Sequence, residues 1–497
     1  MELEFDKRGI TYLQPLLQEV QSQEQTQELR LSDGMPDLGR VLGTWGQVIL
    51  RSKEWRGDRA SITGGVMAFV LYAPEDGSEP RILESWIPFQ MKWDLEDGQR
   101  EGEMRLQCLL RFLDARVVSA RKVMLRCGIG ALGQAFRQET AMLSLPGQLP
   151  EDIQLLKIRY PLRIPKWAGE KSFQLEEELS LSGSAPDIHK LVSYTMEPRI
   201  SECRILSGKV VFRGIGLLHV VYMGEDGRLE SQTMELPFSQ LAELEGVHSP
   251  DAQADVRMAV TSLELDADPE GKLHLKAGML GQYLVDDREM VEIVEDAYSP
   301  DRVVSPKREE LELPQILERQ QVDILVRQTI RQEAREIADV TYLPDFPVAR
   351  RGKGVQLELP GQFQVLWYDE NGLLQSSTAR TEENWDMPAG EDARIRSTVL
   401  PGTPPTGAAG SGMELKGESV LDVTTTSRRG IPMVTGFSIG EELERSPARP
   451  SLILRRAGNA PLWDIAKSSG STVAAIRKAN GLEADPTPGQ ILLIPVS

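Results

Sequence analysis

The four histidines are the first residues to examine for chemistry, because imidazole is a common metal ligand and a general base near neutral pH. They stand far apart and lack a metal-binding spacing such as HxxxH, at His189, His219, His248 and His274. The sequence has no Walker loop and no GxGxxG that opens a helix after a strand. We therefore expect a protein that is not an enzyme and that uses no cofactor and no metal.

An acidic stretch, VVYMGEDGRLE at 220–230, fits either a cation-binding loop or a hairpin turn. A cation loop must keep its oxygen ligands, whereas a tight turn must keep the glycine that adopts a positive φ. The stretches FVLYAPEDG at 69–77 and VLWYDENG at 365–372 share the final glycine, while the acidic positions drift. We therefore interpret 220–230 as the tip of a hairpin.

Composition excludes several classes of function. The net charge of −19 over 497 residues argues against a general nucleic-acid binder and against docking on an anionic membrane. No run approaches the roughly 18 apolar residues of a spanning helix, so we expect no membrane insertion. The charged start, MELEFDKRGITYLQPL, lacks the apolar core of a signal peptide and predicts synthesis in the cytoplasm. Three widely spaced cysteines predict free thiols, at Cys108, Cys127 and Cys203.

Most of the chain repeats itself. LRLSDGMPDLGRVL at 29–42 returns as LSLSGSAPDIHKLV at 179–192, an offset of 150 residues (179 − 29 = 150), and the register holds over more than a hundred residues. A third, more divergent copy keeps QVLWYDENGLLQ at 364–375 and MELKGESVLDV at 413–423. Self-similarity of this kind indicates tandem structural repeats.

Each copy has the pattern of β structure. Its runs are rich in Val, Ile and Leu with short alternation, and Gly, Asp and Pro breakers separate them. We read the long segment 401–412 as an enlarged hairpin loop, because surface loops grow at little cost in free energy. The segment 313–340 also fits a helix. The sequence predicts a mainly β fold with three β-sandwich-like repeats, at 1–150, 151–305 and 306–440.

Two sets of residues leave alternatives open. The repeated pairs Pro36-Asp37 and Pro186-Asp187 fit either a contact site or a turn whose Asp caps a short helical segment. Tryptophans gather in the first copy, where they fit core packing or an interface: Trp45, Trp55, Trp86 and Trp93.

The tail differs from the repeats. After a charged, Pro-containing linker at 441–450, residues 451–497 predict a small βααβ domain. Pro461 suits the first position of the first helix, Thr472 suits the cap of the second, and Gly481 suits its end.

This tail resembles the LysM domain through LWDIAKSSGSTVAAIRKANGL and PGQILLIP. LysM domains bind glycans that contain N-acetylglucosamine. The resemblance therefore implies a binding groove between the loop before the first helix and the segment Leu482–Pro488. Where the family usually has Gly-Asp-Thr or Gly-Asp-Ser, this chain has GNAPLW, without that carboxylate and hydroxyl. This departure favours a protein partner over a sugar. The candidate residues of the groove are Gly458, Asn459, Ala460, Pro461, Leu462, Leu482, Glu483 and Pro488.

The repeats resemble the SPOCS domain through MELEF, MPDLGRVL, APDIHKLV and the hairpins with a Pro-Phe step. With a terminal LysM domain, this architecture resembles the SipL-like family of spore coat morphogenetic proteins. The resemblance implies a scaffold of the mother cell that links a SpoIVA-like coat protein to the forespore surface, with the LysM domain as docking module. The alternative is a protein that uses its LysM domain as an anchor on peptidoglycan or chitin-type glycan.

Overall fold

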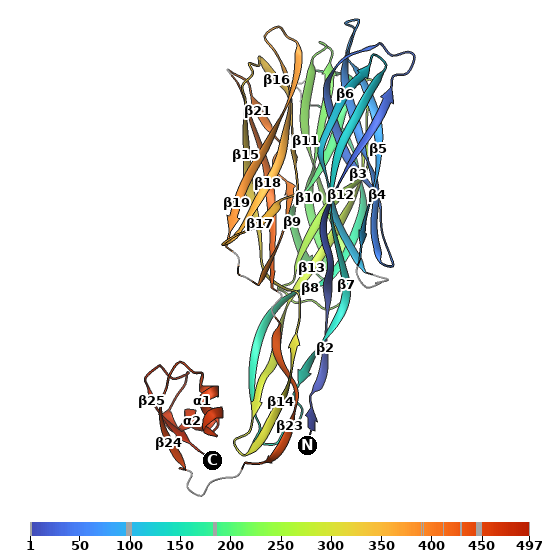
Figure 1. Cartoon of the computed structure of the whole chain (residues 1–497). Helices are drawn as coiled ribbons and strands as arrows, with labels where there is room; N and C mark the ends of the chain where they lie inside the picture. The colour runs from blue at the N-terminus through green and yellow to red at the C-terminus, as the bar shows by residue number, and fades with distance from the viewer. Residues whose placement is uncertain are drawn as a thin grey trace.

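The computed structural model describes residues 2–95, 102–181, 186–388, 390, 392–410, 412–427, 430–443 and 450–496. Long antiparallel strands form an elongated body in which three similar units lie side by side (Figure 1). A narrower β stalk extends from this body, and a small domain with two short helices lies beside the stalk. The mainly β fold predicted from the alternating apolar runs is confirmed.

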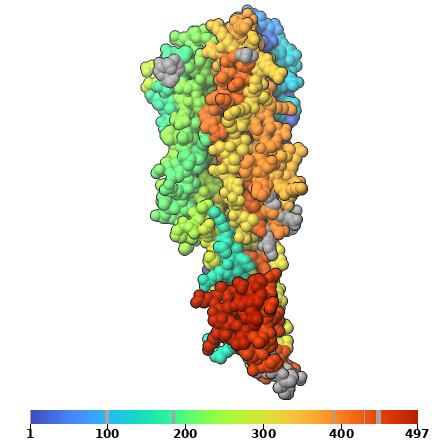
Figure 2. All heavy atoms as spheres, turned by 90° about the vertical axis from the view of Figure 1, so that its left-hand side faces the viewer, coloured from blue at the N-terminus to red at the C-terminus, as the bar shows by residue number. Residues whose placement is uncertain are grey.

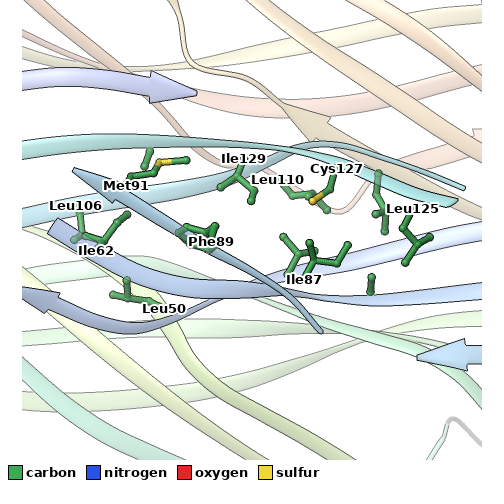
Figure 3. Packing of buried hydrophobic residues seen from close by; sticks show 14 of the residues in the cluster. Leu50, Ile62, Ile87, Phe89, Met91, Leu106, Leu110, Leu125, Cys127 and Ile129 are labelled. Carbon is green, nitrogen blue, oxygen red and sulfur yellow. The ribbon is translucent and has the colours of Figure 1, made fainter. Parts of the chain in front are cut away.

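The first unit consists of two sheets, with strand orders β2-β7-β6 and β3-β4-β5. Apolar residues alternate along β5 and fill the space between the sheets, as Figure 3 shows for Ile87, Phe89 and Met91. The unit is therefore sandwich-like. Its strands are β2 (Asp6–Arg30), β3 (Leu38–Arg56), β4 (Arg59–Pro74), β5 (Arg81–Asp94), β6 (Glu103–Ser119) and β7 (Lys122–Leu145).

The second unit has the same connectivity. Its sheets run β8-β13-β12 and β9-β10-β11, and its core contains the fully buried Phe212 and Met279. Its strands are β8 (Gln154–Leu179), β9 (Ile188–Leu206), β10 (Lys209–Gly224), β11 (Leu229–Glu243), β12 (Gln253–Ala267) and β13 (Leu273–Tyr298).

The third unit follows this plan with shorter strands and with additions. One sheet runs β15-β22-β20, and the other joins β16, β17 and β19 to β18. The segment 401–412 connects the paired strands β20 and β22, so the prediction of an enlarged hairpin loop is confirmed for its described residues. The strands are β15 (Gln315–Ile330), β16 (Glu336–Pro344), β17 (Val348–Arg351), β18 (Val355–Tyr368), β19 (Leu374–Met387), β20 (Ala393–Pro401), β21 (Thr406–Ala408) and β22 (Met413–Ser427).

Two helical interpretations of the sequence are wrong. The segment 313–340 forms β15 and the start of β16, because β15 pairs along its length with β22, as β2 does with β7. Tertiary pairing here overrides a periodicity that also fits a helix. The residues after Pro36-Asp37 and Pro186-Asp187 form β3 and β9 rather than short helices. The Asp37 carboxylate accepts a hydrogen bond from Arg121 instead of capping a helix.

The hairpin interpretation of the acidic stretch is confirmed. In all three units the turn glycine adopts a positive φ, of 73° at Gly77, 77° at Gly227 and 73° at Gly372. Each glycine N–H donates to the carbonyl three residues earlier and closes the turn. The Asp226 carboxylate accepts the backbone N–H of Arg228, so it stabilises the turn itself.

The stalk consists of strand ends that run on beyond the body. The β8 and β13 strands have 26 residues each, so each spans about 85 Å at roughly 3.3 Å per residue. Two further strands from distant parts of the chain, β1 and β14, flank β23 in a separate sheet. These strands are β1 (Glu2–Glu4), β14 (Arg302–Leu311) and β23 (Ile431–Glu442).

The predicted βααβ tail is present as β24 (Leu452–Arg456), α1 (Leu462–Ser469), α2 (Val473–Asn480) and β25 (Ile491–Pro495). The Thr472 hydroxyl accepts the N–H of Ala475, and Gly481 ends α2 at a φ of 60°, as predicted. Pro461 lies one position earlier than predicted, at the N-cap of α1. Of the predicted linker 441–450, residues 444–449 lie outside the described residues. No helix of the described ranges is long and apolar enough to cross a membrane.

Candidate functional site

The terminal βααβ domain has a compact core under its two helices. The α1 helix turns Leu462, Ile465 and Ala466 inward, where they pack with Ile476 of α2. The strands complete this core with Leu492 and Ile494. Leu462, a predicted groove residue, is only 1% exposed and therefore belongs to the core.

The loop before α1 and the turn before β25 are neighbours. The Ala457 N–H donates to the carbonyl of Gln490, and the Gly489 N–H donates to the carbonyl of Ala457, both at 2.7 Å. Four predicted groove residues of the first loop are exposed beside this turn, namely Gly458, Asn459, Ala460 and Pro461. Pro488 is also exposed. The structure thus brings the first loop and the Pro488 turn together.

The remaining candidates lie after α2. The Leu482 N–H donates to the carbonyl of Arg477, and the half-buried Leu482 side chain packs against the core. Glu483 is exposed, and Asp485 pairs with Arg477 at 3.4 Å. This exposed surface offers few polar groups, namely the Asn459 amide and the Glu483 carboxylate, beside apolar prolines. A hydroxyl-rich sugar requires several polar groups that converge on it.

A different face of α1 is covered by the stalk. The Asp296 carboxylate, near the end of β13, accepts hydrogen bonds from the Trp463 indole at 2.9 Å and from the Lys467 ammonium at 2.6 Å. The Tyr298 hydroxyl donates to the carbonyl of Ser471, and the Tyr298 and Trp463 rings lie edge to face at 4.8 Å. Figure 2 shows the terminal domain against the stalk. The stalk therefore holds the domain by α1 and leaves the first loop exposed.

Electrostatics favours this contact. Burial opposes the charge of Asp296, yet the hydrogen bonds from Lys467 and Trp463 outweigh burial and lower its pKa. Burial, together with the nearby Asp296 charge, raises the pKa of Tyr298 to about 12, so its hydroxyl stays a donor. Sequence reasoning missed Asp296 and Tyr298, because nothing local in β13 shows that a domain more than 150 residues later packs against it.

Two of the four histidines, His219 and His274, have polar side-chain partners. His219 lies between Thr233 and Asp339, at 3.0 and 2.8 Å, and His274 lies 3.2 Å from Asp268. Within the described ranges no three His, Cys, Asp or Glu side chains form a group that fits a metal ion.

A cavity of about 770 Å³ lies between the three units and is lined by Glu197, Cys108 and Cys203 among others. Burial raises the pKa of both thiols to about 12, so they are protonated and weak nucleophiles at neutral pH. The cavity therefore holds no activated thiol.

The four tryptophans of the first unit divide between the two predicted roles, core packing and an interface. Trp45 and Trp93 are buried, at 3% and 0% exposure, and Trp55 is half-buried. Trp86 is exposed and lies under the Arg51 guanidinium. Trp93 thus packs in the core of the first unit, whereas Trp45 packs between units, where its indole donates to Asp339.

Comparison with known families identifies two domains. The model of the SipL SPOCS domain matches residues 187–268, in the second unit, and the model of the LysM domain matches residues 462–495. The chain has the SipL-like architecture of SPOCS followed by LysM. No curated protein and no solved structure matches the chain. SPOCS and LysM are non-catalytic binding domains, and together they are typical of a sporulation-related protein with a glycan-binding type of module.

Proposed function

We propose that this SipL-like chain is a non-enzymatic scaffold of the bacterial spore envelope that links coat-assembly proteins to the forespore surface. The LysM domain serves as its docking module, and a SpoIVA-like coat morphogenetic protein is its partner. One observation carries the proposal. The stalk holds the LysM domain through Trp463, Lys467 and Ser471, while the loop at 458–461 is exposed.

The three units support a structural role. A body of long paired strands with buried polar contacts between its units is suited to hold two surfaces at a fixed distance. The protonated thiols of the central cavity also fit a protein without catalytic chemistry.

A second function, anchoring on peptidoglycan or chitin-type glycan, is favoured by the LysM match at 462–495. The first loop argues against it, because Asn459 is the only polar side chain among its four residues. A sugar-binding site normally supplies several donors and acceptors.

The test uses Ala460→Arg in the full chain, which places a bulky charged side chain in the exposed first loop. The matched control is Ala474→Arg, also exposed and on α2. We expect A460R to lose co-purification with the SpoIVA-like partner while A474R retains it, and neither the parent chain nor a variant to be retained on chitin or peptidoglycan. Retention on glycan by the parent chain, lost in A460R, would establish the second function instead. Removing residues 451–497 should likewise abolish capture of coat protein.

A further inference from the structure

A second, small cavity of about 30 Å³ lies where the three units meet, and among the charged side chains that line it the positive ones outnumber the negative ones. Strands from every unit contribute to it: β2, β6 and β7 of the first, β8, β12 and β13 of the second, and β15, β20 and β22 of the third. Four guanidinium groups face two carboxylates there: Arg105, Arg257, Arg319 and Arg396 against Asp255 and Asp422.

Around this cavity the positively charged side chains outnumber the carboxylates with which they pair. Arg105 pairs with Asp255 at 2.6 Å, and Arg257 contacts Asp422 at 3.3 Å. Arg319 turns to Asp286 at 2.8 Å, a fully buried carboxylate that Arg163 also contacts. Together, five guanidinium groups meet three carboxylates, an excess of two positive charges (5 − 3 = 2). Within the described ranges, the Arg396 side chain has no carboxylate partner.

Buried donors in this cluster lack acceptors. The Arg257 side chain is only 7% exposed, yet its Nε and Nη1 have no hydrogen-bond partner among the described residues. The Nε of Arg319 likewise has no hydrogen-bond partner among the described residues. Leaving a buried charged donor unsatisfied costs more than leaving a neutral one, so these groups point to an acceptor that carries negative charge.

Burial works against the charges of this cluster. Burial and the nearby Arg257 charge lower the pKa of Arg105 to about 10. Burial also lowers the pKa of Arg396, and burial together with the Asp255 charge raises the pKa of Asp422. A bound negative charge would counteract both arginine shifts, because it stabilises a guanidinium in its charged form.

We propose that this cavity binds one small monovalent inorganic anion, of the size of a halide, which joins the three units. A water molecule needs roughly 10–15 Å³ of cavity volume. The cavity therefore has room for about two waters or one halide but not for a phosphate. The 770 Å³ cavity shares Asp255 and Arg257 with this cavity and supplies a route for the ion.

The direct test is a crystal of the full chain grown or soaked in sodium bromide, with data collected at the bromine absorption edge. We expect an anomalous peak inside the cavity, within hydrogen-bonding distance of the Arg257 guanidinium. Density for water without an anomalous peak, in crystals whose surface sites carry bromide, would overturn the proposal.

The solution test compares two arginines of β20. Arg396→Met removes a guanidinium that lines the cavity, whereas the control Arg394→Met removes an exposed one from the same strand. We expect chloride to raise the thermal unfolding midpoint of the parent chain and of R394M by about 2 °C over gluconate at equal ionic strength. In R396M the half-saturating chloride concentration should be about tenfold higher. Equal responses of all three proteins would contradict the proposal.

Discussion

The three-unit body and the LysM domain are held in place by contacts of different kinds. Within the body, units are joined through buried groups, as where the Trp45 indole and His219 both bond to the fully buried Asp339 carboxylate. The LysM domain instead contacts the stalk with one face of α1, through a small patch centred on Asp296. The difference teaches that the body is built to keep one shape, whereas the LysM domain is a module attached to it.

Apolar cores should dominate the stability of the body, which gives the largest expected effect. Phe212 is fully buried in the second unit and packs near Phe173, at 6.4 Å between ring centroids. Phe212→Ala should lower the free energy of unfolding by about 4 kcal/mol, because it leaves a cavity. Chemical denaturation followed by circular dichroism measures this, with Leu206→Ala, 55% exposed, as control. A loss below about 1 kcal/mol would contradict a tightly packed core.

The contact between units should rank second. Asp339→Ala removes the carboxylate shared by Trp45 and His219, at 2.8 Å from each, and should cost about 3 kcal/mol. Asp339→Asn keeps one acceptor and should cost less. If both substitutions left unfolding in denaturant unchanged, the Asp339 carboxylate would contribute nothing to the contact between units.

The same contact should depend on pH. Burial alone would lower the pKa of His219, but the charge and the hydrogen bond of Asp339 outweigh burial and raise it. A raised folded-state pKa means that the ion pair stabilises fully below the unfolded value of about 6.5, and that this stabilisation is lost as pH rises through the folded pKa. Denaturation at a series of pH values should show this decline in the parent chain and not in His219→Gln. The exposed His274→Gln is the control, and a decline that persists in H219Q would refute the assignment.

The smallest effect on the body should come from the LysM contact. Asp296→Ala removes the acceptor of Trp463 and Lys467, so backbone amides of α1 should exchange hydrogen about tenfold faster. The free energy of unfolding of the body should change by less than about 0.5 kcal/mol. Hydrogen exchange read by mass spectrometry measures both, with the exposed Asp464→Ala as control. Unchanged exchange in α1 would show that Asp296 does not hold the domain.

The sequence predicted local structure better than long-range contact. Turn glycines such as Gly227 carry a conformational requirement within a few residues, and the 150-residue offset repeats it, so hairpins were predictable. The strand β15 was ambiguous, because its pairing with β22 spans about 100 residues and leaves no local mark. The pairing of β1 with β23 is longer still.

The candidate groove shows the same division. Exposure of Asn459 and Pro488 followed from their loop and turn positions, whereas Leu462 belongs to the core because helix periodicity turns it inward. The predicted repeat boundaries at 150, 305 and 440 remain predictions. The stalk mixes strands from all three repeats, as where β14 and β1 both pair with β23.

The central claim is that this chain is a scaffold of the spore envelope, and its location in sporulating cells tests that claim most directly. A fluorescent reporter fused to the full chain should give a ring of fluorescence around the forespore, because the proposed docking module would attach the fusion protein to the forespore surface. Uniform fluorescence throughout the cytoplasm of sporulating cells would contradict the claim.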